Sequence, residues 1–129
     1  MNWSYFILVY FLQIALTLPE FRQTCSQPQP WLLYFSHHIL DVFLFWSPLF
    51  LRTRSDYIAH ASATIIVIIH WLMNNNTCIM TTWMNKRCGY PEGDWLDSLK
   101  NMVGLRTRSE WFHFIWLGLL LGWDVWMLL

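Results

Sequence analysis

The sequence predicts an all-α integral membrane protein with four transmembrane helices and one or two short interfacial helices between the third and the fourth. Three observations predict this fold class. The 129 residues are 56% hydrophobic and 19% aromatic, and four long apolar runs alternate with polar segments. Only 12% of the chain is charged, about half of the usual share in soluble domains. A small soluble domain buries only about 60–70% of the surface of its unfolded chain, so lipid is the natural solvent for the remainder.

The four apolar runs are the predicted spans of a single membrane domain that covers residues 1–129. They lie at about residues 3–18, 31–51, 57–73 and 111–129. A helix needs about 20 mostly apolar residues to cross a hydrocarbon core of about 30 Å. We end the first run at Pro19 because proline lacks the amide hydrogen of a continuing helix. This run has no basic segment before it and no small-residue cleavage site after it, which favours a retained helix over a signal peptide.

A repeated segment predicts where the third and fourth helices begin. Leu51-Arg-Thr-Arg-Ser-Asp-Tyr recurs as Leu105-Arg-Thr-Arg-Ser-Glu-Trp. In each copy a threonine stands three residues before an acidic residue, Asp56 or Glu110, which is the pattern of a capping box. We interpret the repeat as convergent helix-start chemistry rather than as an internal duplication. Its arginines are expected to reach lipid headgroups; they are Arg52, Arg54, Arg106 and Arg108.

The loop of residues 74–110 is the one sizeable segment expected outside the membrane. Residues 77–88 and 91–103 each carry apolar side chains at helical spacing and stop before a glycine, so we expect two short helices in the membrane interface. Aromatic and large apolar side chains are favoured anchors at protein contacts. The anchors that we expect for a partner or for the interface are Trp83, Trp95 and Leu99.

Three cysteines are too few for a disulfide scaffold. Cys78 and Cys88 lie ten residues apart in the same loop and could form a disulfide, while unpaired thiols are the alternative. The orientation follows from the basic residues. The first and third loops carry more lysine and arginine than the second, so the positive-inside rule predicts that both termini lie outside and that loop 74–110 lies in the cytoplasm.

Ionisable residues inside the predicted spans are candidates for function, because each costs at least about 2.5 kcal/mol at the bilayer centre. His37, His38 and Asp41 share one face of the second helix, and we expect His70 of the third helix to complete a buried polar cluster. A histidine beside a carboxylate can neutralise it, relay a proton or become an oriented ligand. We interpret the cluster as a group of polar side chains that satisfy one another and hold the helices together. Asp124 lies near the far interface, where we expect it to be hydrated.

Small residues four positions apart predict close helix packing. Ala59 and Ala63 form such a pair in the third helix, and Gly118 and Gly122 form one in the fourth. We expect both pairs to face neighbouring helices of the same chain.

The sequence points away from enzymatic chemistry. It contains no glycine-rich phosphate loop, no His-Glu-x-x-His zinc motif and no Gly-x-Ser-x-Gly elbow. Eight basic and eight acidic residues balance, so nothing predicts nucleic-acid binding. We expect no cofactor and no metal ion. His60 and His70 point about 80° apart and so cannot face one haem, and only His37 or His38 could pair with His70 or His113 across helices. A di-iron site needs more histidines and carboxylates than any one face carries.

One stretch resembles a known group of proteins. The segments Asp56-Tyr-Ile-Ala-His60 and His70-Trp71, followed by an asparagine-rich turn and Cys78-x-x-Thr81, are similar to a pattern in small uncharacterised multi-span membrane proteins of large nucleocytoplasmic DNA viruses. The resemblance covers residues 56–89, and it implies a location in the internal membrane of a virion or in the host membrane from which it forms. Thr82-Trp-Met84 stands where the group carries an acidic residue.

These observations predict a non-enzymatic membrane protein with a structural or assembly role, which binds other membrane or capsid proteins through loop 74–110. Two alternatives remain open at this point. One is a membrane-anchor subunit of a redox or proton-handling complex, with haem or quinone near Asp41 and the histidines. The other is a channel of the viroporin kind, with Asp41 facing a pore.

Overall fold

The computed structural model describes residues 1–25, 30–88 and 110–129. These residues form α1 (Trp3–Thr24), α2 (Trp31–Phe45), the 3-10 helix η1 (Ser47–Leu49), α3 (Arg54–Met73), α4 (Ile79–Cys88) and α6 (Glu110–Leu128). No β-strand occurs among them. The predicted all-α class is therefore confirmed. The predicted helix of residues 91–103 lies outside the described residues.

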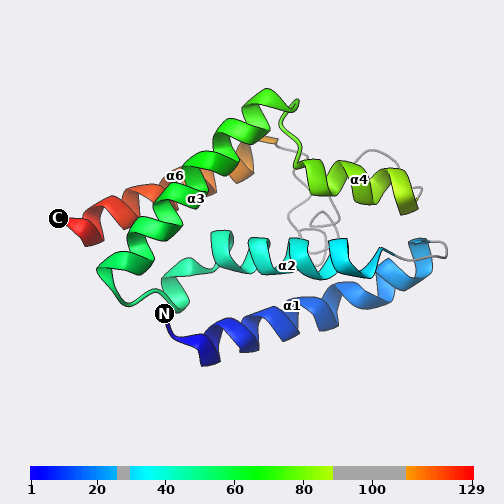
Figure 1. Cartoon of the computed structure of the whole chain (residues 1–129), viewed down its shortest axis with the longest axis horizontal. Coiled ribbons are helices and arrows are strands. Elements are labelled where there is room, and N and C mark those ends of the chain that lie inside the picture. Colours follow the sequence, from blue (N-terminus) through cyan, green and yellow to red (C-terminus); the bar gives the residue numbers. More distant parts are fainter. Residues whose placement is uncertain (26–29, 89–109) are drawn as a thin grey trace.

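The helices form two antiparallel pairs that share α2 as their common neighbour. α1 and α2 run side by side, and so do α3 and α6 (Figure 1). α2 contacts α1, α3, α4 and α6, and α4 lies along the half of α2 that begins at Trp31 (Figure 1). α2 is therefore the helix that the other described helices share as a neighbour.

α1 continues to Thr24 with Pro19 inside it, so the predicted end at residue 18 is wrong. Proline removes one backbone hydrogen bond, but contacts after it hold the helix together. Phe21 is buried, and its ring centroid lies 4.2 Å from that of Tyr34 and 5.1 Å from that of Trp31. Tertiary packing on α2 thus extends α1 by one and a half turns beyond the proline.

α2 ends at Phe45, earlier than the predicted residue 51, because Pro48 follows. The chain tightens there into η1, where the backbone N–H groups of Phe50 and Leu51 both donate to the carbonyl of Ser47 at 3.1 and 3.0 Å. Phe50 and Leu51 are completely buried against Val42 and Tyr57. The second half of the predicted run is therefore a packed turn rather than α-helix.

The predicted capping box at the start of the third helix is confirmed. The Thr53 hydroxyl accepts the Asp56 N–H at 3.3 Å, and the Asp56 carboxylate accepts the Thr53 N–H at 2.9 Å. These bonds satisfy two amide groups that would otherwise be unpaired at the helix end. α3 consequently begins at Arg54, three residues before the predicted start. The second copy of the pattern begins outside the described residues.

Two described helices are long and apolar enough to cross a membrane, namely Trp3–Gln23 and Arg54–Met73, and only 22% of the apolar stretch of each is buried. The apolar helices Trp31–Phe45 and Phe112–Leu128 are shorter. The exposed apolar residues include Leu8 at 63% and Ile66 at 66% exposure. The core helix of a soluble protein would be mostly buried, whereas these two helices could span a membrane by length and composition and leave most of their apolar stretch exposed.

Candidate functional site

Polar side chains lie inside the bundle, where a soluble protein would place apolar ones. We name the larger group the Asp41 cluster. It comprises polar side chains from α1, α2 and α4 that are buried or largely so, namely Gln13, Thr17, Tyr34, His37, His38, Asp41 and Thr81. The predicted cluster of His37, His38 and Asp41 is thus brought together, but its partners come from α1 and α4.

His38 anchors the α1 side of the Asp41 cluster. Its Nε2 lies 2.8 Å from the Thr17 hydroxyl, and its Nδ1 lies 2.9 Å from the Tyr34 carbonyl oxygen. The carbonyl can only accept, so Nδ1 carries a proton. The Thr17 hydroxyl itself donates to the Gln13 carbonyl at 3.0 Å. The Tyr34 hydroxyl lies 2.8 Å from the same threonine oxygen. These bonds join α1 to α2 at the level of His38.

Asp41 and His37 form the other half of the cluster. The Gln13 side-chain amide donates to Asp41 Oδ2 at 3.4 Å, and His37 Nδ1 lies 3.1 Å from the same oxygen. The ring N–H is not well aligned on that oxygen, so the contact is chiefly electrostatic. His37 Nε2 lies 3.1 Å from the Thr81 hydroxyl of α4. Asp41 thus has two polar neighbours, and His37 links it to α4.

His70 does not belong to the Asp41 cluster, so that part of the prediction is wrong. Its Nε2 accepts the backbone N–H of Ile79 at 3.1 Å. His70 lies in the last turn of α3, where the chain reverses through Asn75 and Asn76 at φ values of 51° and 59°. Asparagine tolerates this left-handed conformation. The turn brings the first residue of α4 onto the imidazole, which therefore caps α4.

A second buried pair was not predicted. His60 Nδ1 lies 2.5 Å from Asp124 Oδ2, and both side chains are 0% exposed. His60 Nε2 lies 3.1 Å from the Leu44 carbonyl oxygen. The expectation of a hydrated Asp124 is wrong because α6 packs along α3 up to this level. The spacing of Leu117, Leu120 and Asp124 on one stripe of α6 was the available signal.

The predicted small-residue packing faces are mostly wrong. Gly118 and Gly122 are exposed, and a Cβ added to either would meet no atom within 4 Å. Ala59 is also exposed, whereas Ala63 is partly buried against the cluster of Leu44 and Trp71. The heavier residues Leu117 and Leu120 face α3 instead, so α3 and α6 meet through interdigitating large side chains rather than through close backbone approach.

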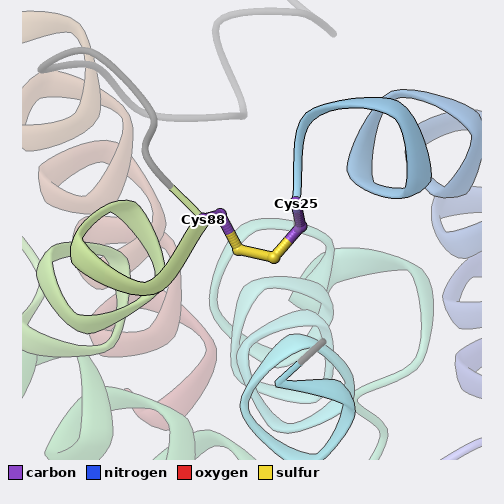
Figure 2. Close-up of a disulfide and its surroundings, with 2 residues drawn as sticks. All are labelled: Cys25 and Cys88. Carbon is purple, nitrogen blue, oxygen red and sulfur yellow. A yellow bond between two sulfur atoms is a disulfide. The ribbon is translucent and has the colours of Figure 1, made fainter. Parts of the chain in front are cut away.

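A disulfide joins Cys25 after α1 to Cys88 at the end of α4 (Figure 2). The pairing of Cys78 with Cys88 is therefore wrong, and Cys78 is a free thiol. Cys78 precedes α4 and Cys88 ends it, so the helix separates them by about 15 Å. A disulfide tolerates at most about 7 Å between Cα atoms, and Cys25 and Cys88 are 4.1 Å apart.

Three of the remaining predicted contact residues lie in the described part of the chain, namely Trp83, Arg52 and Arg54. Trp83 is 55% exposed on α4, as a contact anchor requires. Arg52 and Arg54 are exposed, and the Arg52 guanidinium donates to the carbonyls of Leu51 and Leu49 at 2.8 and 2.9 Å. Arg52 therefore stabilises the turn after η1 as well as being available to headgroups. The other predicted contacts, Trp95, Leu99, Arg106 and Arg108, lie outside the described residues.

The side chains of the Asp41 cluster and of the His60–Asp124 pair contact groups on other helices of the same chain and so hold these helices together. Both ring nitrogens of His37, His38 and His60 face protein groups, and each of Asp41 and Asp124 has a histidine beside it. Within the described part of the chain, no group of three or more histidine, cysteine or acidic side chains could hold a metal ion. Gln13 Oε1 and Asp124 Oδ1 are buried and make no hydrogen bond among the described residues. The contacts that the other polar atoms make join the helices at fixed positions. No family model, curated protein or solved structure matches this chain.

Proposed function

We propose that this chain is a four-span integral membrane protein with a structural or assembly role. The observation that carries the proposal is the inversion of polarity across the bundle. Asp41, Asp124 and their histidines are buried, while large apolar side chains cover the outer sides of α1, α3 and α6. In lipid, polar groups must be satisfied within the protein, and apolar ones can face outwards.

The lengths of α2 and α6 support the two additional spans. α2 has 15 residues, and at 1.5 Å per residue it is about 22 Å long. Trp46 and η1 add about 8 Å, since a 3-10 helix rises about 2 Å per residue. α6 has 19 residues, or about 28 Å. Each then matches a hydrocarbon core of about 30 Å, or a slightly thinned one.

The contacts at the two ends of the bundle support an up-and-down topology. At one end the amino group of Met1 lies 2.6 Å from Asp56, and the Asn2 N–H donates to the Phe50 carbonyl at 2.6 Å. At the other end the disulfide joins Cys25 to Cys88. The N-terminus and the α2–α3 turn would therefore share one side of the membrane, and α4 would share the other with the α1–α2 connection.

The disulfide also bears on orientation. Disulfides persist in oxidising compartments and are rare where glutathione keeps thiols reduced. We therefore propose that α4 faces an oxidising compartment and that the termini face the cytosol. This is opposite to the orientation predicted from basic residues. The charge rule is a statistical bias over short loops, whereas an oxidised cysteine pair requires its redox environment, so we give the disulfide more weight.

The structural role rests on what the buried polar residues contact. The redox and channel alternatives would require His37, His38 or Asp41 to turn from their present partners towards a cofactor or a pore. In their present contacts, the same residues hold α1, α2 and α4 together. Trp83, Lys86 and Arg87 are exposed on α4. We propose that this surface contacts a membrane or capsid protein. The resemblance of residues 56–89 makes an internal virion membrane, or its host precursor, the proposed location.

A photo-crosslinking amino acid at position 83 tests the partner contact. We expect irradiation of the native membrane to give discrete protein adducts from position 83, because Trp83 points away from the bundle. The matched control is the same substitution at Leu8, whose exposed side chain faces lipid in this account. Adducts to protein from position 83 and to lipid from position 8 support the proposal. Lipid adducts alone from both positions would contradict it.

A further inference from the structure

His60 of α3 and Asp124 of α6 meet where these two helices lie side by side, near the end of α2 (Figure 1). Both side chains are 0% exposed. His60 Nδ1 lies 2.5 Å from Asp124 Oδ2, and His60 Nε2 lies 3.1 Å from the carbonyl oxygen of Leu44 in the last turn of α2. The imidazole therefore stands between two oxygen atoms that belong to two other helices.

The hydrogen bonds of this pair set how many protons it carries. A backbone carbonyl can only accept, so Nε2 of His60 carries a proton. A second proton lies between Nδ1 and Asp124 Oδ2, because a nitrogen and an oxygen approach this closely only as the donor and acceptor of one hydrogen bond. Whether the nitrogen or the oxygen holds this second proton, the pair carries two protons and has no net charge.

Separate histidine and aspartate side chains in water carry only one of these protons at neutral pH. A free imidazole loses its second proton near about pH 6.5, and a free aspartic acid loses its proton near about pH 3.9. Formation of the contact between α3 and α6 therefore takes up one proton at any pH above about 6.5 at which the pair is intact.

Loss of the second proton would break one of the two contacts. The remaining proton could lie on Nδ1, facing Asp124, or on Nε2, facing Leu44, and the other contact would then join two acceptors. The pair would also carry one net negative charge, while Asp124 Oδ1 is buried and makes no hydrogen bond among the described residues. Burial of such a charge is costly. Separation of α6 from α3 would relieve this cost, because it exposes Asp124.

The surrounding helices carry other ionisable groups, none of which is a described partner of the pair. They are Tyr34, His37, His38 and Asp41 of α2, Arg54, Asp56, Tyr57 and His70 of α3, and Glu110 and His113 of α6. Asp41 contacts Gln13 and His37, and Asp56 contacts the amides of the α3 cap and the amino group of Met1. Both groups on α6 lie at least about 16 Å from Asp124 along the helix. The proton is therefore bound by His60 and Asp124 themselves.

We propose that the His60–Asp124 pair is a proton-binding site that holds α6 on α3 and weakens this hold as the pH rises. The folded pair carries two protons where the separated side chains carry one, so unfolding releases a proton and the folded state loses stability with rising pH. Below about pH 6.5 the free histidine also carries two ring protons, so the contribution of the pair to stability is constant there.

The pair lies near one end of the bundle. α3 begins at Arg54 and α6 ends at Leu128, so His60 and Asp124 lie about 9 and 6 Å from those ends along the helices. In the proposed topology this end faces the same side as the N-terminus, and the pair responds to the pH on that side. The side rests on the proposed topology, whereas the number of bound protons rests on the contacts of the pair alone.

The test compares the complete protein with Asp124→Asn in mild detergent. Asparagine can donate an amide hydrogen to His60 Nδ1 while Nε2 still donates to Leu44, so the variant keeps both contacts without the extra proton. Denaturant titrations followed by tryptophan fluorescence give the unfolding constant of each protein from about pH 7 to about pH 8.5. We expect the constant of the original protein, divided by that of the variant, to rise about tenfold per pH unit, because unfolding releases one proton. Groups elsewhere in the chain that titrate in this range affect both proteins equally.

His37→Gln is the matched control, because it removes another histidine that lies beside a carboxylate and leaves the His60–Asp124 pair in place. Its unfolding constant should rise with pH as steeply as that of the original protein. A ratio between the original protein and D124N that stays constant with pH would overturn the proposal, and so would a pH dependence that disappears in H37Q and persists in D124N. If neither variant folds, an unfolding constant of the original protein that does not rise over this range would overturn it as well.

Discussion

Replacing Asp124 by alanine is expected to lower the free energy of unfolding by about 3–5 kcal/mol, the usual cost of removing one partner from a buried charged pair. Asp124 and His60 are both fully buried, and the substitution would leave the buried imidazole without its carboxylate. The loss can be measured by denaturant titration in mild detergent, followed by tryptophan fluorescence.

Two further variants show whether the loss of stability comes from the His60–Asp124 pair or from ordinary packing. Gly118→Ala should change the free energy of unfolding by less than about 0.5 kcal/mol, because its added methyl group meets no atom and surface changes are usually this small. The double variant with leucine at positions 60 and 124 should recover most of the loss, since an apolar pair of similar volume is often neutral. A loss below about 1 kcal/mol for Asp124→Ala would contradict the buried contact between α3 and α6.

Replacing Cys25 by serine is expected to lower the free energy of unfolding by about 4 kcal/mol, because the lost cross-link would otherwise restrict the unfolded chain. The Cys25–Cys88 disulfide spans a separation of 63 residues, and longer loops give larger effects. Its loss should also loosen α4, where Met84 packs in the same buried cluster as Cys25 and Cys88. Thermal unfolding of the purified protein in detergent measures the effect.

Cys78→Ser is the control for this substitution, because it removes a sulfur and leaves the cross-link intact. It should leave thermal unfolding near that of the original protein, and a reductant should destabilise it as much as Cys25→Ser does. If a reductant left the unfolding temperature of the original protein unchanged, the contribution of the disulfide to stability would be refuted.

The parts of the fold that the sequence predicts are those decided locally. The capping box of Thr53 and Asp56 involves residues three positions apart, and its hydrogen bonds form as expected. The apolar runs likewise predict the helices and their approximate ends. Two ends differ. α1 continues past Pro19 because the burial of Phe21 against another helix outweighs the local cost of proline, and α2 ends at Phe45 because Pro48 follows.

The parts that escaped prediction depend on contacts between distant residues. His60 and Asp124 are 64 positions apart, and Cys25 and Cys88 are 63 apart. Spacing within one helix shows which residues share a face, but it does not show which helix that face will meet. This is why His37, His38 and Asp41 were grouped correctly while Gln13, Thr17 and Thr81 were not expected. The outward position of Gly118 and Gly122 could not be predicted for the same reason. Large side chains of α6 occupy the face that packs on α3, so the glycines lie on the other side.

The central claim is that the helices cross the bilayer alternately, with the disulfide on one side and the N-terminus with the α2–α3 turn on the other. Labelling of sealed membrane vesicles with a maleimide that cannot cross membranes tests it most directly, using single cysteines at Gln23, Arg52 or Leu129 in a Cys78→Ser background. We expect the cysteines at Arg52 and Leu129 to label from one side and the cysteine at Gln23 to label from the other. Labelling of the Gln23 and Arg52 positions from the same side would contradict a membrane-spanning α2 and, with it, the four-span arrangement.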